Sequence, residues 1–401
     1  MTYIQKGTKT YTNASIALFL GGFVTFATLY ATQPLLPILA KEFHVSAAAA
    51  SITLSITTGI MAIMMLIAAS ISDVIGRKRI MILSMFLTSM IGMLTAFSPN
   101  FITLVLLRGL LGICIAGLPS IAMTYIGEEF EPSGLGKVMG LYICGNGIGG
   151  MTGRIFIGIA TDLSSWRVAL GLLGILTVIC SILFWRTLPT PMNSKKKAVH
   201  VRSMWNAYTI HFKNKQLVAT ILLGFTLMGS FVTLYNYIGF LLQEPPYSLS
   251  QTLIGFLFIV YVIGTFSSVF MGKQADQHGR TFTLMVSITI MMIGALVTLI
   301  PNLVVKIVGL SIFTFGFFGS HSIASASIEK YADVNKAQAA ALYLLFYYLG
   351  SSFVGSFSGY FWEHFHWIGV ISLIVMLLMG GLSLVLLTRK EYQMEHHKAK
   401  F

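Results

Sequence analysis

Two long runs without a charged residue constrain this chain more than any other feature. Residues 14–40 contain no Asp, Glu, Lys or Arg, and neither do residues 45–72. Each run is longer than the ~20 residues that a helix needs to cross the hydrocarbon core of a bilayer. Only helices and closed barrels can span a bilayer, because lipid offers the backbone no hydrogen-bond partner. Since alternating strands of about 10 residues are absent, we predict an all-α membrane protein.

The composition supports this class, because 56% of the residues are hydrophobic and only 10% are charged. A soluble domain carries roughly 25% charged residues. Charges, prolines and glycines divide the chain into twelve predicted spans: 14–39, 46–72, 80–97, 101–127, 138–160, 168–187, 217–242, 250–271, 282–300, 303–327, 338–361 and 367–388.

The positive charge follows membrane topology. The formal net charge is +13, yet the basic residues gather in the two tails and in alternate loops. The other loops contain only Lys41, Arg167 and Lys306. By the positive-inside rule, both termini are cytoplasmic. We therefore predict a multi-pass protein of the cell membrane (inner or plasma membrane) and expect no nucleic-acid partner.

The chain repeats itself on either side of its largest polar break, Arg186–Gln216, which contains seven basic residues and two prolines. The sequence FVTFATLY at residues 23–30 resembles FVTLY at residues 231–235, and Pro-Asn occurs at residues 99–100 and again at 301–302. We predict an N-terminal six-helix bundle (1–187), a cytoplasmic linker (188–216) with a short interfacial helix near residues 203–212, and a C-terminal six-helix bundle (217–401). Duplicated halves of this kind are typical of transporters.

A charged turn, Asp-x-x-Gly-Arg, occurs once in each half, between the second and third spans. The first copy consists of Asp73, Gly76 and Arg77, and the second copy consists of Asp276, Gly279 and Arg280. Glycine permits a tight turn, and an Asp–Arg pair at a helix end can hold one arrangement of two bundles and release it in another. The alternative is a plain loop whose basic residues only set orientation. Because the turn occurs at matched positions, we favour a conformational latch.

These turns resemble the signature loop of the major facilitator superfamily, G-x-x-x-D-R-x-G-R-R, although Ala69 and Val74 replace its first Gly and Arg. Arg108 and Gly112 in the fourth span resemble the family's R-x-x-x-G motif. The resemblance covers the whole chain. It implies a major facilitator fold, with twelve transmembrane helices in two pseudo-symmetric six-helix bundles, and transport by alternating access.

The fifth span resembles the family's antiporter motif, G-x8-G-x3-G-P. Gly140, Gly149 and Gly153 fit it, whereas Arg154 occupies the proline position. The stretches 145–154, 319–325 and 342–352 resemble the acriflavine-sensitivity, arabinose-efflux-like branch of the drug–proton antiporters. That resemblance implies efflux. Glycine-rich stretches such as 145–153 more often serve close helix packing than ligand contact.

Arg108, Arg154 and His321 are the ionisable residues predicted to lie inside spans. A charge in the membrane costs ~3 kcal/mol or more, so each residue is a functional hypothesis. Arg108 is a candidate for coupling protonation to opening, for binding a substrate carboxylate, or for anchoring backbone carbonyls. We expect Arg154 to stabilise the fifth span against its neighbours, and a direct role in transport is the alternative. His321 titrates near neutral pH, so it and Asp73 are candidates for carrying the proton, and packing is the alternative for His321.

The resemblance implies a cavity lined by the first and fourth helices of each half. Aromatic side chains there would suit flat apolar ligands, although the tyrosines could instead form an interfacial belt. The first span contains no acid, which argues against a strictly cationic substrate. The candidate substrate-binding residues are Tyr30, Gln33, Arg108, Tyr235, Asn236 and His321.

Neither a cofactor nor a metal is expected. Cys114, Cys144 and Cys180 are scattered over predicted spans, which suggests no disulfide framework and no metal site, and no phosphate-binding G-x4-G-K-[ST] pattern occurs. We predict a monomeric secondary transporter, not an enzyme, that couples proton entry to efflux of small amphiphilic compounds. The alternative is a proton-coupled transporter of an organic anion or sugar, in which Arg108 binds the substrate itself.

Overall fold

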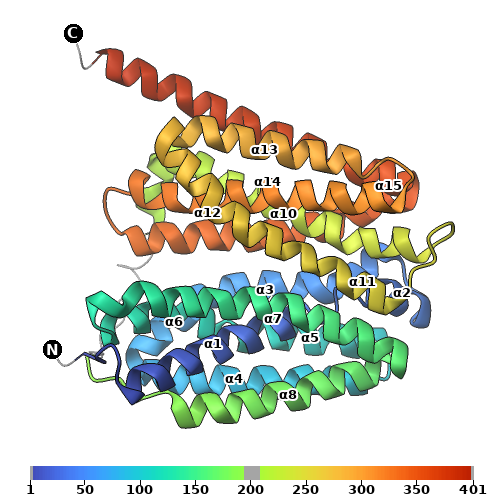
Figure 1. Cartoon of the computed structure of the whole chain (residues 1–401), viewed down its shortest axis with the longest axis horizontal. Helices are drawn as coiled ribbons and strands as arrows, with labels where there is room; N and C mark the ends of the chain where they lie inside the picture. The colour runs from blue at the N-terminus through green and yellow to red at the C-terminus, as the bar shows by residue number, and fades with distance from the viewer. Residues whose placement is uncertain (1–2, 194–207, 399–401) are drawn as a thin grey trace. The chain divides into compact units, whose positions relative to one another are not determined.

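Long helices make up most of the computed structural model, which describes residues 3–193 and 208–398 (Figure 1). The helices of the first half are α1 (Lys9–Leu29), α2 (Leu36–Glu42), α3 (Ala47–Ile75), α4 (Arg77–Leu94), α5 (Phe101–Ile115), α6 (Gly117–Glu129), α7 (Leu135–Leu163) and α8 (Trp166–Thr187). Those of the second half are α10 (Lys215–Gln243), α11 (Gln251–Phe256), α12 (Tyr261–His278), α13 (Arg280–Val297), α14 (Leu303–Tyr331) and α15 (Lys336–Lys398).

All twelve predicted spans fall on these helices. Within the described residues, 10 helical segments are long and apolar enough to cross a membrane. The segment α7 is not among them, because Asn146, Arg154 and several glycines lower its hydropathy. The last two predicted spans both lie in α15. His366 has non-helical angles (φ 50°, ψ −143°), and it divides α15 into two helices.

Three predicted spans are not continuous helices, and one of them, 101–127, is divided at Ala116 into α5 and α6. The first, 14–39, is wrong as a single helix because α1 ends at Leu29 and α2 begins only at Leu36. Pro34 lacks the N–H that would bond to the carbonyl of Tyr30, and the N–H of Gln33 bonds to that carbonyl instead (3.0 Å). The predicted span 250–271 likewise starts as α11, passes through a 3-10 turn (Leu257–Val260) and continues as α12.

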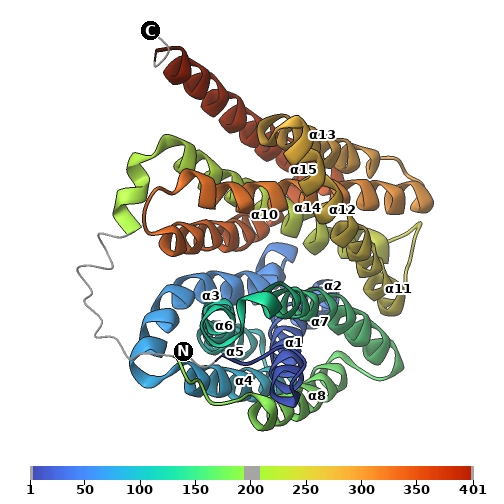
Figure 2. The ribbon, with the colours of Figure 1, turned by 60° about the vertical axis from the view of Figure 1, so that its left-hand side comes forward.

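The helices form two compact units. Within the described residues, unit 1 comprises 3–45, 52–193 and 248–258, and unit 2 comprises 46–51, 208–247 and 259–398. In unit 1, α4 and α8 lie side by side, as do α1 and α7 (Figures 1 and 2). The short helix α11 belongs to unit 1, where the Asp162 carboxylate accepts the N–H groups of Gln251 (3.2 Å) and Thr252 (2.7 Å).

Close packing of α1 on α7 depends on three glycines spaced four residues apart, Gly145, Gly149 and Gly153. A Cβ atom added at Gly149 would lie 2.3 Å from the carbonyl oxygen of Phe23 on α1. Unit 2 repeats this contact, because a Cβ added at Gly350 on α15 would lie 2.2 Å from the carbonyl oxygen of Phe225 on α10. Small residues allow two membrane helices to approach at backbone distance, and the repetition agrees with the predicted duplication.

The predicted linker 188–216 begins as part of unit 1. The carboxylate of Glu129, at the end of α6, is fully buried and accepts the N–H groups of Met192 (2.8 Å) and Asn193 (2.9 Å). Residues 194–207 lie outside the described residues, and so does the first half of the predicted interfacial helix at 203–212. The chain continues with a 3-10 turn at Ile210–Lys213 that leads into α10.

Candidate functional site

The carboxyl end of α1 is held by Arg108 of α5. Arg108 is 1% exposed. It donates to the carbonyl oxygens of Thr28 (3.1 Å) and Leu29 (2.5 Å) on α1, and to that of Thr53 on α3 (2.8 Å). The last carbonyls of a helix have no intrahelical partner, and the helix dipole is negative there. Arg108 of α5 therefore joins α1 and α3, and its bond to the carbonyl of Leu29 satisfies an acceptor that the break in α1 leaves open.

Arg154 of α7 holds the turn that follows α1. Its Nε donates to the side-chain oxygen of Gln33 (2.8 Å), and its Nη1 donates to the carbonyl of Gly150 (2.5 Å). The guanidinium carbon lies 4.1 Å from the centre of the Tyr30 ring and 4.5 Å from that of Phe258. This is a cation–π arrangement on two aromatic rings. The sequence assigned Arg154 to helix packing and Tyr30 and Gln33 to the substrate, whereas the structure places all three together.

We call this set the α1-end cluster; its members are Thr28, Leu29, Tyr30, Gln33, Arg108 and Arg154. Among the described residues, no carboxylate forms an ion pair with Arg108. The three interpretations of Arg108 can now be weighed. Its bonds to backbone carbonyls match the anchoring interpretation, and they occupy donors that a substrate carboxylate would need.

The second group of candidates surrounds His321 in unit 2. The Nδ1 atom of His321 on α14 lies 2.9 Å from the hydroxyl of Tyr343 on α15. The imidazole is nearly parallel to the ring of Phe317, at 4° with centroids 5.9 Å apart, and its centroid lies 4.6 Å from that of Tyr347. The ring of Phe231 on α10 also stacks on that of Phe317, with centroids 3.8 Å apart. We call Phe231, Phe317, His321, Tyr343 and Tyr347 the His321 cluster.

The other two candidates on α10 have different surroundings. Tyr235 lies beside the His321 cluster, with its ring 4.9 Å from that of Phe231 and its hydroxyl 2.7 Å from that of Thr314. Asn236 lies elsewhere, because its amide donates to the hydroxyl of Ser51 (2.9 Å), which in turn donates to the carbonyl of Gly355 (2.9 Å). The structure therefore groups Tyr235, but not Asn236, with His321.

The first charged turn forms an ion-pair network. Gly76 has φ 111°, a conformation that favours glycine. Its neighbour Arg77, at the start of α4, reaches Asp73 at 3.3 Å and Glu128 of α6 at 2.7 Å. No motif in the sequence predicted a role for Glu128. The one sequence feature that marks this residue is its position at the end of the fourth predicted span. The turn thus connects three helices through charge.

The second charged turn has the same backbone conformation as the first but lacks its ion-pair network. Gly279 has φ 90°, as the repeat predicts. Arg280, however, donates to the carbonyl of Ala326 (3.1 Å). In the part of the chain that the structure describes, neither Arg280 nor Asp276 forms an ion pair. The two copies are therefore alike in shape and different in electrostatics.

This asymmetry predicts unequal mutant effects at matched positions. Asp73→Asn is expected to lower transport turnover on the order of five-fold, because it removes a half-buried ion pair worth about 1 kcal/mol, while KM stays nearly constant. Asp276→Asn, the matched control, is expected to change turnover little. Initial transport rates in proteoliposomes measure both. Equal effects of the two substitutions would show that the ion pairs do not act as a latch.

No metal centre accompanies these groups: the side chains described for residues 3–193 and 208–387 contain no cluster of three His, Cys, Asp or Glu that could hold an ion. The glycines of the antiporter-like motif differ in what surrounds them. Gly149 and Gly153 face α1, whereas nothing lies within 4 Å of a Cβ built on Gly140.

Comparisons with known proteins agree with this architecture. A sequence profile described as Major Facilitator Superfamily matches residues 18–332 and 245–400. The uncharacterized MFS-type transporter YybF of Bacillus subtilis (strain 168) is 45% identical over 384 residues, 96% of this chain and 95% of that protein. The inner membrane transport protein YnfM of Escherichia coli (strain K12) is 38% identical over 380 residues, 95% of this chain and 91% of that protein.

Among solved structures, a bacterial homolog of the human lysosomal transporter Spinster, crystallised in an inward-facing and occupied conformation, has a TM-score of 0.78. The similarity covers 96% of this chain and 98% of that one, at 14% sequence identity. At that identity the likeness concerns the fold, and it confirms the predicted all-α membrane architecture.

Proposed function

The chain belongs to the major facilitator superfamily, and we propose that it exports small, planar amphiphilic compounds in exchange for protons. The predicted class, a multi-pass secondary transporter of small molecules and not an enzyme, follows from the family and is confirmed. Efflux, proton coupling and the kind of substrate are the proposal. Alternating access of the two bundles would carry substrate and proton in opposite directions.

The observation that carries the proposal is the stacking of a titratable ring among aromatic rings. The imidazole centroid of His321 lies 5.9 Å from the ring centroid of Phe317, 5.8 Å from that of Tyr343 and 4.6 Å from that of Tyr347. Flat aromatic surfaces favour planar ligands through burial and stacking, and an imidazole can bind and release a proton. One cluster therefore offers a surface for the substrate and a group for the proton.

Protonation of His321 would change this cluster in two ways. An imidazolium donates from both nitrogens, so the Tyr343 hydroxyl, 2.9 Å from Nδ1, would have to accept a hydrogen bond. The ring would also become a cation stacked on aromatic faces, where a planar substrate would compete for the same faces. Binding of proton and substrate would thus oppose each other, as exchange requires.

His321→Ala is expected to reduce transport driven by a pH gradient to the level of protein-free liposomes, because the proton-binding group is lost. The same variant should still exchange labelled for unlabelled substrate across the membrane without a gradient, because the neighbouring aromatic rings remain. Reconstituted proteoliposomes measure both activities.

The matched control is His364→Ala, since His364 is exposed and bonds to the carbonyl of Tyr360 in its own helix (2.9 Å). It should leave both activities unchanged. Full gradient-driven transport by His321→Ala would remove the proton role from this residue. Loss of exchange as well as gradient-driven flux would assign His321 to binding or folding instead.

The alternative, transport of an organic anion or sugar, depends on Arg108 reaching the substrate. The three carbonyls that Arg108 binds make this the less favoured function. A transported anion whose affinity falls when Arg108 is replaced by lysine, in a protein of unchanged stability, would reverse that preference.

A further inference from the structure

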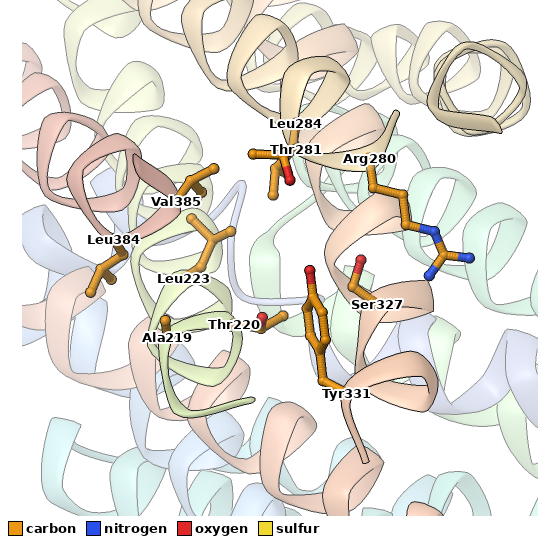
Figure 3. Close-up of a pocket in the computed structure, with 10 residues that line it drawn as sticks. All are labelled: Ala219, Thr220, Leu223, Arg280, Thr281, Leu284, Ser327, Tyr331, Leu384 and Val385. Atoms are coloured by element: carbon orange, nitrogen blue, oxygen red, sulfur yellow. The ribbon is translucent and has the colours of Figure 1, made fainter. Parts of the chain in front are cut away.

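A pocket at one end of unit 2 lies apart from the His321 cluster. It is an open groove formed by α10, α13, α14 and α15, and its space of about 390 Å³ includes space that is open to the surroundings (Figure 3). Its lining residue Ser327 lies six positions beyond His321 on α14, about 9 Å along the helix. Neither the proposed substrate surface nor the proposed proton-binding group lies in this pocket.

The lining of the pocket has a polar side and an apolar side. Arg280, Thr281, Ser327 and Tyr331 provide a guanidinium and three hydroxyls, and the hydroxyls of Thr281 and Tyr331 point into the space between the helices (Figure 3). The opposite side is closed by aliphatic side chains of α10, α13 and α15: Ala219, Leu223, Leu284, Leu384 and Val385. A ligand that fits this lining is itself amphipathic.

Arg280 gives the pocket its charge. Its hydrogen bond to the carbonyl of Ala326 (3.1 Å) is the only one of its guanidinium within the described residues, and no carboxylate of that part of the chain neutralises it. A guanidinium has five N–H donors whose geometry matches two oxygens of a phosphate. Most of its donors therefore remain available to an anionic group.

The pocket lies at the depth of lipid headgroups. Arg280 is the first residue of α13 and Tyr331 is the last of α14, so the polar side of the lining lies within about 6 Å of these helix ends, whereas Leu223 lies about 12 Å into α10. By the predicted topology, this is the cytoplasmic surface. In the nearby segments 208–219, 272–282 and 326–338, six basic residues outnumber three acidic ones. Such juxtamembrane basic pockets attract anionic lipids.

We propose that this pocket binds one anionic phospholipid of the cytoplasmic leaflet. The phosphate would be held by Arg280, with the hydroxyls of Thr281 and Tyr331 beside it, and the upper part of an acyl chain would lie on Leu223 and Val385. Because Arg280 belongs to the second charged turn, the lipid would supply the negative partner that Glu128 supplies to Arg77 in the first turn.

Native mass spectrometry of the purified protein, titrated with phosphatidylglycerol, phosphatidylethanolamine or inorganic phosphate, tests this site. We expect one phosphatidylglycerol to be retained at least about ten-fold more strongly than phosphatidylethanolamine. Arg280→Gln removes the charge, and Ala219→Phe fills the apolar side without changing charge. Each should abolish this preference. Lys330→Gln is the matched control, because Lys330 is exposed and lies one turn from Ser327 outside the lining.

Several results would overturn the proposal. Equal retention of the two lipids, or an equal loss in Lys330→Gln and Arg280→Gln, would mean that only diffuse surface charge attracts lipid. Binding of inorganic phosphate as tight as that of phosphatidylglycerol would identify a site for a free anion. Should Arg280→Gln fold poorly, Ala219→Phe decides alone, and normal lipid preference in that variant contradicts the site.

Discussion

Arg108→Ala is expected to destabilise the protein on the order of 3 kcal/mol and to abolish transport. The substitution leaves buried carbonyls of Thr28, Leu29 and Thr53 without their charged donor, and each hydrogen bond to a charged group contributes roughly 1.5–3 kcal/mol. Relief of the buried charge offsets part of the loss. Unfolding in detergent, followed by temperature or denaturant, measures the change.

Two further variants test whether the lost hydrogen bonds to the carbonyls cause the destabilisation. Arg79→Ala removes an exposed arginine and should leave stability unchanged. Arg108→Lys should lie between the wild type and alanine, because an ammonium cannot reach three carbonyls in the fixed geometry of a guanidinium. If Arg108→Ala unfolds like the wild type and yet fails to transport, Arg108 acts on substrate or proton, and the anchoring interpretation is wrong.

Gly149→Ala is expected to cost about 3 kcal/mol, because the added methyl group meets backbone that cannot move alone. Its Cβ would lie 2.3 Å from the oxygen and 2.6 Å from the Cα of Phe23, so α1 and α7 would have to separate. Overpacking of a tight contact costs typically 1–3 kcal/mol, and these distances place Gly149 at the upper end. Thermal unfolding and the yield of monodisperse protein report the effect.

Gly140→Ala provides the control within the same sequence motif. Nothing lies within 4 Å of the added methyl group, and alanine favours a helix over glycine by up to about 1 kcal/mol, so this variant should be as stable as the wild type or more so. If Gly140→Ala lost transport while Gly149→Ala kept both stability and transport, the motif would act on transport and not through packing.

The sequence predicted the spans well, because a segment that crosses the hydrocarbon core of the bilayer must be long and nearly free of charge. It also predicted the glycine turns, which the positive φ angles of Gly76 and Gly279 confirm. It did not predict the end of α1 at Leu29, since the apolar run continues through Pro34 and Pro37 without a charge. Hydropathy measures only whether a segment prefers lipid, and it is blind to a helix break that buried arginines stabilise.

The residue types of the candidate site were predictable, but their grouping was not. His321 and Tyr343 belong to different helices, and only the packing of α14 on α15 brings the ring nitrogen to the hydroxyl. Arg154, Tyr30 and Gln33 likewise meet across two helices. A one-dimensional pattern gives the depth of a residue along its helix, whereas the direction in which it points depends on the neighbouring helices.

The most direct test of proton-coupled export uses inverted membrane vesicles that carry an imposed proton gradient and a fluorescent pH probe. Planar neutral and zwitterionic dyes, lipophilic cations and small organic anions are added in turn, with vesicles lacking the protein as the control. Dissipation of the gradient by planar amphiphiles, absent in the control and in His321→Ala vesicles, is the predicted result. A response confined to organic anions or sugars, or none in the presence of folded protein, would contradict the proposed function.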